Sequence, residues 1–177
     1  MLLTQVEIEG GRFHAEQVSL GDILAKSAKR AGRLAVARRV GIEIPHGEIG
    51  WTIGERELLT RAWTALLETA VKVSTAGEAV QVKVCELDDV VVLALDTQSG
   101  IIPPAVLPGF FLPFTMSEAS TCAGSLGLDP AMARRILSLW SSSVTAENLT
   151  PSGVRFTVRC PRAAKSQSVA AIEVSGG

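Results

Sequence analysis

The sequence predicts a single α/β or α+β domain. Its 177 residues are enough for one hydrophobic core and too few to require two domains. Segments with helical spacing of apolar residues are interspersed with segments in which apolar and polar residues alternate, which is the pattern of strands. No internal repeat is visible, so we expect no repeat architecture.

The composition excludes several classes of protein. Seventeen basic and eighteen acidic residues leave a net charge of -1, which is too balanced for a nucleic-acid binder. No apolar run approaches the roughly twenty residues that span a bilayer, and no signal-peptide pattern precedes residue 30. We therefore expect a cytoplasmic protein without direct membrane contact. Three cysteines without CxxC spacing and two distant histidines predict neither a disulfide framework nor a zinc site.

The chain is interpreted as beginning in the last turns of a helix. Leu2, Leu3 and Val6 have helical spacing, and Gly10 and Gly11 follow as a helix breaker. Because a domain rarely begins in this way, we expect a further segment upstream of residue 1.

Two long helices are predicted in the first half of the chain. Ser19, followed three residues later by Asp22, resembles a capping box, and the apolar stripe after it predicts a helix over residues 20–38. A second amphipathic helix follows Gly54 and should end near Ser74.

Strands are predicted where apolar and polar residues alternate or where β-branched residues cluster. A first strand is expected around His14. Further strands are expected at 40–44, in a hairpin of 80–84 with 90–95, and at 143–148 and 154–160.

Residues 97–129 show no lasting periodicity and contain four of the eight prolines, so we interpret them as a lid. Asp129 as the cap and Pro130 at the first helical position predict a helix that runs to about Ser141. Residues 163–177 form a small-residue tail that is either a linker or, over 169–174, an edge strand.

Four segments resemble the sequence boxes of the ATP-binding domain of sensor histidine kinases. Residues 65–72, Ala-Leu-Leu-Glu-Thr-Ala-Val-Lys, are similar to the N box, and 96–101, Asp-Thr-Gln-Ser-Gly-Ile, are similar to the G1 box. Residues 110–114, Phe-Phe-Leu-Pro-Phe, resemble the F box, and 127–136, beginning Gly-Leu-Asp-Pro, resemble the end of the G2 box. Their order and spacing over residues 2–161 carry more weight than any single box.

This resemblance implies a fold, a cofactor and partners. The fold is a two-layer α+β sandwich, the Bergerat type, in which helices cover one face of a mixed sheet and ATP with Mg²⁺ lies between helices and lid. Residues 1–10 would end an upstream dimerisation helix, 11–162 would form the ATP-binding domain, and 163–177 would be a tail or linker. The implied partners are dimerisation helices that carry the phosphoacceptor and a response regulator, with no nucleic acid.

The resemblance also assigns candidate nucleotide-binding residues. Asp96 would accept a hydrogen bond from the adenine amino group and Gly100 would keep the following turn. Lys72 would lie near the phosphates. The remaining candidates are Thr69, Gly127 and Leu128. Two alternatives stay open: Asp96 simply ends a strand and caps the loop, and Lys72 pairs with Glu68 one helical turn earlier.

Four departures from the boxes predict a weakened phosphate and magnesium site. The two N-box asparagines are Ala65 and Thr69 here, so the usual amide ligand of Mg²⁺ is missing. Two glycines are replaced by Gln98 and Asp129, where backbone N–H groups would approach the phosphates. The segment 97–129 also contains no Lys or Arg to offset the charge of a triphosphate.

Three hypotheses for function follow from these observations. The first is a two-component signalling module with impaired nucleotide binding that regulates or binds its partners. The second is an active catalytic domain that binds Mg·ATP and phosphorylates a histidine on a dimerisation domain outside this chain. The third is a phosphotransfer protein that keeps the fold as a scaffold. Neither His14 nor His46 lies in a phosphoacceptor context, and we assign no catalytic residue and no metal ligand.

The aromatic residues are assigned mainly to packing. Trp51, Trp63 and Trp140 are expected in the core or at its rim. The F-box-like Phe110, Phe111 and Phe114 either hold the lid down or present an apolar patch to a partner.

Overall fold

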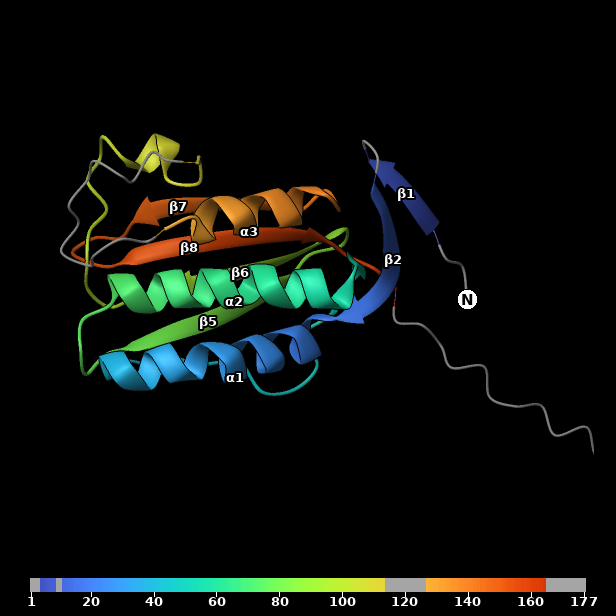
Figure 1. The fold of residues 1–177 in the computed structure, drawn as a ribbon. Helices are drawn as coiled ribbons and strands as arrows, with labels where there is room; N and C mark the ends of the chain where they lie inside the picture. The colour runs from blue at the N-terminus through green and yellow to red at the C-terminus, as the bar shows by residue number, and fades with distance from the viewer. Residues whose placement is uncertain (1–3, 9–10, 114–126, 165–177) are drawn as a thin grey trace, which may run out of the picture.

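The computed structural model describes residues 4–8, 11–113 and 127–164 (Figure 1). The larger of its two sheets has five strands in the order β3-β5-β6-β8-β7. Strand β3 runs parallel to β5, and every other neighbouring pair in this sheet is antiparallel. The strands are β3 (Gly41–Glu43), β5 (Ala79–Glu86), β6 (Val90–Asp96), β8 (Val154–Pro161) and β7 (Ser143–Asn148).

Three helices lie side by side over one face of this sheet (Figure 1). They are α1 (Leu20–Arg38), α2 (Arg56–Val73) and α3 (Asp129–Ser138), and α2 lies between the other two. The predicted two-layer α+β arrangement, a mixed sheet covered by helices on one face, is confirmed.

The ends of α1 and α2 follow from local chemistry. Ser19 caps α1 because its hydroxyl accepts a hydrogen bond from the Asp22 N–H at 3.3 Å, as the capping-box pattern predicted. Helix α1 ends where Arg39 adopts the left-handed conformation, with φ 57°. Helix α2 ends at Val73, and the backbone N–H of the capping residue Ser74 bonds to the Ala70 carbonyl. The predicted bounds of both helices are confirmed.

Alternation along the strands separates the two faces of the sheet. In β6 the buried residues Val91, Leu93 and Leu95 face the helices, and in β8 Val154, Phe156, Val158 and Cys160 do the same. The residues between them therefore point to the opposite face, which no helix covers in Figure 1. Trp63 of α2 is fully buried in the core between the layers, and Trp140 is nearly so.

A second, smaller sheet lies beside the end of the larger one (Figure 1). Strand β2 (Gly11–Ser19) pairs antiparallel with β1 (Thr4–Ile8) and with β4 (Trp51–Gly54). The predicted helical ending is wrong for residues 4–8, which form a strand. The β-branched residues Thr4, Val6 and Ile8 stand at alternate positions, and a partner strand follows immediately in the chain.

The start of α3 differs from the prediction. Leu128 is the residue before the helix, Asp129 is its first residue, and Pro130 is its second. The carboxylate of Asp129 does not cap the helix because it bonds to Lys72 of α2. The helix ends at Ser138 rather than near Ser141, which has a positive φ of 57°.

None of the helices in the described part of the chain combines the length and the apolar character that a membrane span requires.

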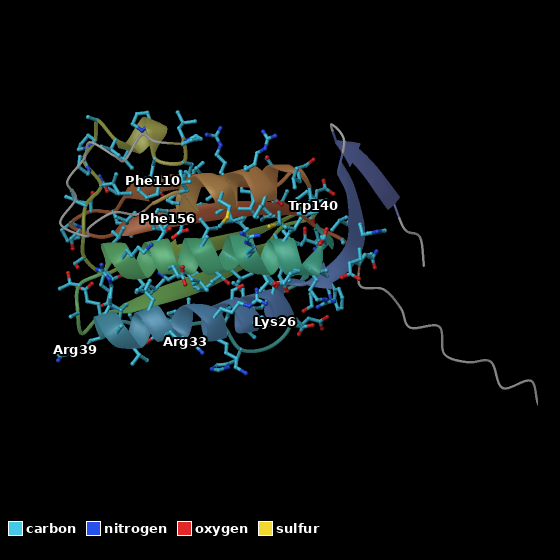
Figure 2. The ribbon with its side chains drawn as sticks, viewed as in Figure 1. Lys26, Arg33, Arg39, Phe110, Trp140 and Phe156 are labelled. Atoms are coloured by element: carbon cyan, nitrogen blue, oxygen red, sulfur yellow. The ribbon has the colours of Figure 1, made fainter. Side chains whose placement is uncertain are left out.

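The first part of the predicted lid packs onto the sheet. Residues 97–113 include a short 3-10 helix, η1 (Leu107–Gly109), and Phe110 and Phe111 are buried after it. The Phe110 ring lies 5.4 Å from the Phe156 ring of β8 and 5.0 Å from the Phe111 ring, between ring centroids (Figure 2). These contacts favour the interpretation that the F-box-like segment holds the lid down. Phe114 lies outside the described residues.

Candidate functional site

Asp96 is the residue predicted to accept a hydrogen bond from adenine, and its carboxylate accepts hydrogen bonds from two cations of the protein. Arg155 of β8 donates to it from Nε at 2.6 Å and from Nη2 at 2.8 Å, in a two-pronged contact. Lys83 of β5 donates from Nζ at 2.8 Å. The side chain of Asp96 is only 8% exposed, so water competes weakly for the carboxylate.

The side chain of Asp96 lies on the face of the sheet that is away from the helices. Asp96 pairs directly with Arg155 across β6 and β8, and side chains of directly paired residues share a face. Lys83 stands at a diagonal position on β5. The carboxylate of Asp96 therefore points away from α1, α2 and α3.

The charge state of Asp96 follows from these contacts. The hydrogen bond from Arg155 lowers the pKa of Asp96 below its usual value, burial opposes this effect, and Lys83 adds to the lowering. The same contact raises the pKa of Arg155, with a smaller contribution from Glu147 of β7. The carboxylate is therefore held ionised as part of an ion-pair cluster, which agrees with the alternative that Asp96 serves the structure at the end of its strand. Its role toward adenine remains a prediction.

Lys72, the predicted phosphate cation, is bonded to Asp129. Its Nζ lies 2.9 Å from Asp129 Oδ2, and the two side chains are 18% and 32% exposed. Glu68 is close enough to both groups for their charges to act on it. Burial raises the pKa of Glu68 most, Asp129 raises it further, and Lys72 lowers it. Lys72 is thus paired with Asp129, the residue that stands where the G2 box of the resembling family has a glycine. The alternative of a direct bond from Lys72 to Glu68 is not seen.

Thr69, at the predicted magnesium position, is fully buried. Its hydroxyl donates to the Ala65 carbonyl one turn earlier at 2.7 Å, so the group is directed toward the backbone of its own helix within the core. Ala65 itself is buried and has no ligand atom in its side chain. Within the described ranges no cluster of three His, Cys, Asp or Glu residues could hold a metal ion. These residues do not fit a magnesium ion of the type that the family binds.

The backbone at position 100 requires a glycine. It has φ 90°, and an added Cβ would come within 2.7 Å of the Val73 carbonyl oxygen at the end of α2. The segment before it is also fixed, since Thr97 Oγ1 accepts from the Val154 N–H at 2.8 Å. Ser99 Oγ donates to Glu78 Oε2 at 2.8 Å. The G1-like turn is therefore held against α2 and β8 by the protein itself.

The structure brings some of the predicted residues together and separates others. Lys72 at the end of α2 adjoins Gly100 through Val73, and Gly127 and Leu128 precede its partner Asp129. Gly127 has a positive φ of 64°, and Leu128 is exposed. Thr69 lies one turn earlier in α2 but points into the core. Asp96 stands apart from this group on the other face of the sheet.

Two kinds of residue were missed by sequence reasoning. Arg155 and Lys83, the partners of Asp96, lie in strands that were predicted, but nothing in their spacing identified the pairing. Arg30 and Arg61 line a cavity of about 200 Å³ beside Ala65, Glu68 and Asp129. Arg61 stands one helical turn before Ala65 in the same helix, whereas only the packing of α1 against α2 brings Arg30 to the N-box-like segment.

Comparison with known proteins identifies the fold. No family model and no curated protein sequence matches the chain. Among solved structures, the mycobacterial sensor histidine kinase MprB matches with a TM-score of 0.72 and 20% identity, over 85% of this chain and 100% of that chain. The Acinetobacter baumannii histidine kinase AdeS matches with a TM-score of 0.67 and 17% identity, over 87% of this chain and 70% of that chain. The catalytic domain of histidine kinase ThkA matches with a TM-score of 0.67 and 16% identity, over 84% of this chain and 97% of that chain.

The chain therefore has the fold of histidine kinase catalytic domains. This agrees with the arrangement that the sequence boxes implied.

Proposed function

We propose that this chain is a histidine-kinase-like ATP-binding domain of two-component signalling whose nucleotide site is impaired, and that it acts as a regulatory or interaction module. One observation carries the proposal. The three side chains assigned to adenine, phosphate and magnesium, which are Asp96, Lys72 and Thr69, each bond to another group of the protein.

At the adenine end, a nucleotide would have to compete with cations. Hydrogen bonds that involve a charged group contribute about 1.5–3 kcal/mol each, and Asp96 accepts three of them from Arg155 and Lys83. A neutral adenine amino group offers a weaker bond than either cation. The position of the carboxylate on the face away from the helices adds a geometric cost, because the strand end would have to turn over.

At the phosphate end, the local charge opposes binding. Lys72 is neutralised by Asp129, and Glu68 adds a second carboxyl group within the same region. A polyphosphate that approached Lys72 would have to displace one carboxylate and would be repelled by both. The buried hydroxyl of Thr69 supplies no ligand for the Mg²⁺ that would reduce this repulsion.

Calorimetric titration of the chain with Mg·ATP tests the proposal. We expect binding far weaker than that of a working kinase, and we expect the removal of magnesium to change it little. A low-micromolar dissociation constant that depends on magnesium would overturn the proposal. As a second readout, millimolar ATP should leave the thermal unfolding midpoint almost unchanged, because only a tightly bound ligand shifts it strongly.

The second candidate function, an active catalytic domain, is favoured by one feature of the site. Arg30 and Arg61 line the cavity beside Ala65, so cations are present near the N-box-like segment. Full-length ShkA, whose crystal structure was solved in complex with AMPPNP, also shares the fold with a TM-score of 0.69 and 17% identity, over 93% of this chain and 33% of that chain. Transfer of the γ-phosphate from radiolabelled ATP to a dimerisation domain would establish this function, and its absence would support the first.

The proposed partners are the dimerisation helices of the same or a related protein and a response regulator. ThkA, whose structure was solved in complex with the response regulator protein TrrA, shares the fold with a TM-score of 0.69 and 13% identity, over 88% of this chain and 44% of that chain. We also propose that residues 11–162 form the functional domain, with β1 packed onto it as an added strand of the smaller sheet.

A further inference from the structure

Five cations form a continuous exposed surface over α1 and α2, which we name the basic face. Lys26, Lys29, Arg30 and Arg33 follow one another at helical spacing along α1, and Arg61 joins them from α2. All five side chains are exposed. Figure 2 labels Lys26 and Arg33 on α1. The four α1 residues also line a shallow hollow of about 510 Å³.

The basic face is poorly compensated by acidic groups. Glu57 of α2 accepts from Arg30 at 2.8 and 3.2 Å, which is the nearest carboxylate contact. The hydrogen bond from Arg30 lowers the pKa of Glu57 most, and the charges of Lys26 and Arg61 lower it further. The single carboxylate of Glu57 therefore lies near three cations. Lys26, Lys29 and Arg33 form no ion pair with any residue that the structure describes.

This concentration of charge contrasts with the rest of the chain. The whole chain has a net charge of -1, so the cations of the basic face are offset by acids that lie elsewhere. Like charges at one-turn spacing on a helix destabilise it slightly, and of the four α1 cations of the basic face only Arg30 is paired with a carboxylate that the structure describes. Such a patch produces a local positive potential that steers an oppositely charged partner into place.

The composition of the basic face indicates the kind of partner. It contains no aromatic side chain on which a nucleic-acid base could stack, and no Trp, Phe or Leu that could enter a lipid headgroup layer. Val36, which is 79% exposed, continues the same stripe one turn beyond Arg33 and offers a single apolar contact. A positively charged surface of this kind is complementary to an acidic surface of another protein.

We propose that the basic face of α1 and α2 binds an acidic helix of a partner protein, with carboxylates spaced to meet Lys26, Lys29 and Arg33. The inference rests on the proposed function only in that a protein partner exists, and it does not depend on whether nucleotide binds. The partner is defined by its charge pattern, with acidic residues at positions i, i+3, i+4 and i+7 of a helix.

The probe for this proposal is a fluorescently labelled helical peptide with glutamate at those four positions, titrated with the full chain and followed by anisotropy. We expect binding that weakens steeply as salt is raised. In the variant Lys26→Glu/Lys29→Glu/Arg33→Glu the affinity should fall at least about tenfold. A peptide with lysine in place of glutamate should bind that variant better than it binds the parent.

The matched control is Arg134→Glu/Arg135→Glu/Arg159→Glu, which makes the same change of net charge at exposed cations outside the basic face. It should keep most of the affinity for the acidic peptide. Circular dichroism establishes that each variant is folded, and Lys26→Gln/Lys29→Gln/Arg33→Gln replaces the charge-reversed variant if that one unfolds.

Several outcomes would overturn the proposal. They are an acidic peptide that does not bind, an equal loss of affinity in the control, and tighter binding of duplex DNA or of phosphatidylcholine–phosphatidylserine vesicles than of the peptide. None of these results bears on the Mg·ATP titration, so the failure of this proposal is distinguishable from the failure of the proposed function.

Discussion

Asp96 and Arg155 stand directly opposite each other on β6 and β8 and are joined by two hydrogen bonds of 2.6 and 2.8 Å. Lys83 on β5 bonds to the same carboxylate, and Glu147 on β7 faces Arg155 from the other side. Charges of alternating sign therefore cross four strands on the face away from the helices. A residue that the G1-like box assigns to adenine is thus the centre of a structural cluster.

Removal of the charge of Asp96 should destabilise the fold. In Asp96→Asn the carbonyl oxygen can still accept from one of the two cations, Arg155 and Lys83, but the amide nitrogen would face the other, and the negative charge that both cations share is lost. We expect the free energy of unfolding to fall by about 1–3 kcal/mol, measured by urea denaturation at neutral pH. Asp88→Asn, the same change at an exposed turn, should have almost no effect. A loss as small as that of the control would contradict the structural role of Asp96.

The same cluster predicts a dependence of stability on acid. The contact with Arg155 makes the pKa of Asp96 lower in the folded state than in the unfolded state. Its contribution is therefore present above the unfolded value of about 4 and is lost as the pH falls through the folded value. Urea midpoints of the parent and of Asp96→Asn should converge as the pH is lowered below about 4. A constant difference between the two at all pH values would argue against this assignment.

Glu68 should behave in the opposite sense. Burial and, to a lesser extent, Asp129 raise the pKa of Glu68 in the folded state. Its contribution to stability is thus fully present below the unfolded pKa and is lost as the pH rises through the folded pKa. We expect Glu68→Gln to unfold at higher urea than the parent at neutral pH and at similar urea in acid. A variant that is less stable at neutral pH would show that Glu68 makes a favourable contact that outweighs its burial.

Two glycines should respond in opposite directions to substitution by alanine. Gly100→Ala places a methyl group against the Val73 carbonyl at a positive φ, which should cost about 1–3 kcal/mol. Gly32→Ala lies inside α1 with open space around it and should stabilise the helix by about 0.5–1 kcal/mol. Thermal unfolding of both variants beside the parent measures the two effects. Equal shifts of the same sign would contradict the placement of the G1-like turn against α2.

Release of Lys72 should improve nucleotide binding if the local charge limits it. Asp129→Asn keeps the size of the side chain but removes the charge that pairs with Lys72. We expect affinity for a fluorescent ATP analogue to rise up to about tenfold, equivalent to about 1.4 kcal/mol. Asp88→Asn is the control for a general change of net charge. If Asp129→Asn is folded and binds no better than the parent, the ion pair is not what limits the site.

The elements that the sequence predicted well are those with a complete local signal. The apolar stripe of α2 and the capping box at Ser19 need no knowledge of distant residues, and the hairpin of β5 and β6 connects neighbours in the chain. Strand β4 was not predicted, because its four residues pair with the distant strand β2 and not with a neighbour in the chain. Strand β1 was read as a helix because the spacing of Leu2, Leu3 and Val6 outweighed the β-branched alternation that begins at Thr4.

The candidate site was less predictable because its contacts join distant parts of the chain. Arg155 is 59 residues from Asp96, and Asp129 is 57 residues from Lys72. The resemblance to the sequence boxes predicted which segments would form the site and which box residues are replaced, and these assignments stay predictions. The conformation of the side chains at those positions depends on strand pairing and on helix order, which no local pattern encodes.

The larger sheet ends in two short edge strands, and this bears on the behaviour of the protein at high concentration. The edge strand β3 has three residues and β7 has six, with Glu147 exposed in β7. A short or charged edge is a poor template for strand addition by a neighbouring molecule. The domain should therefore resist fibril-like self-association in storage.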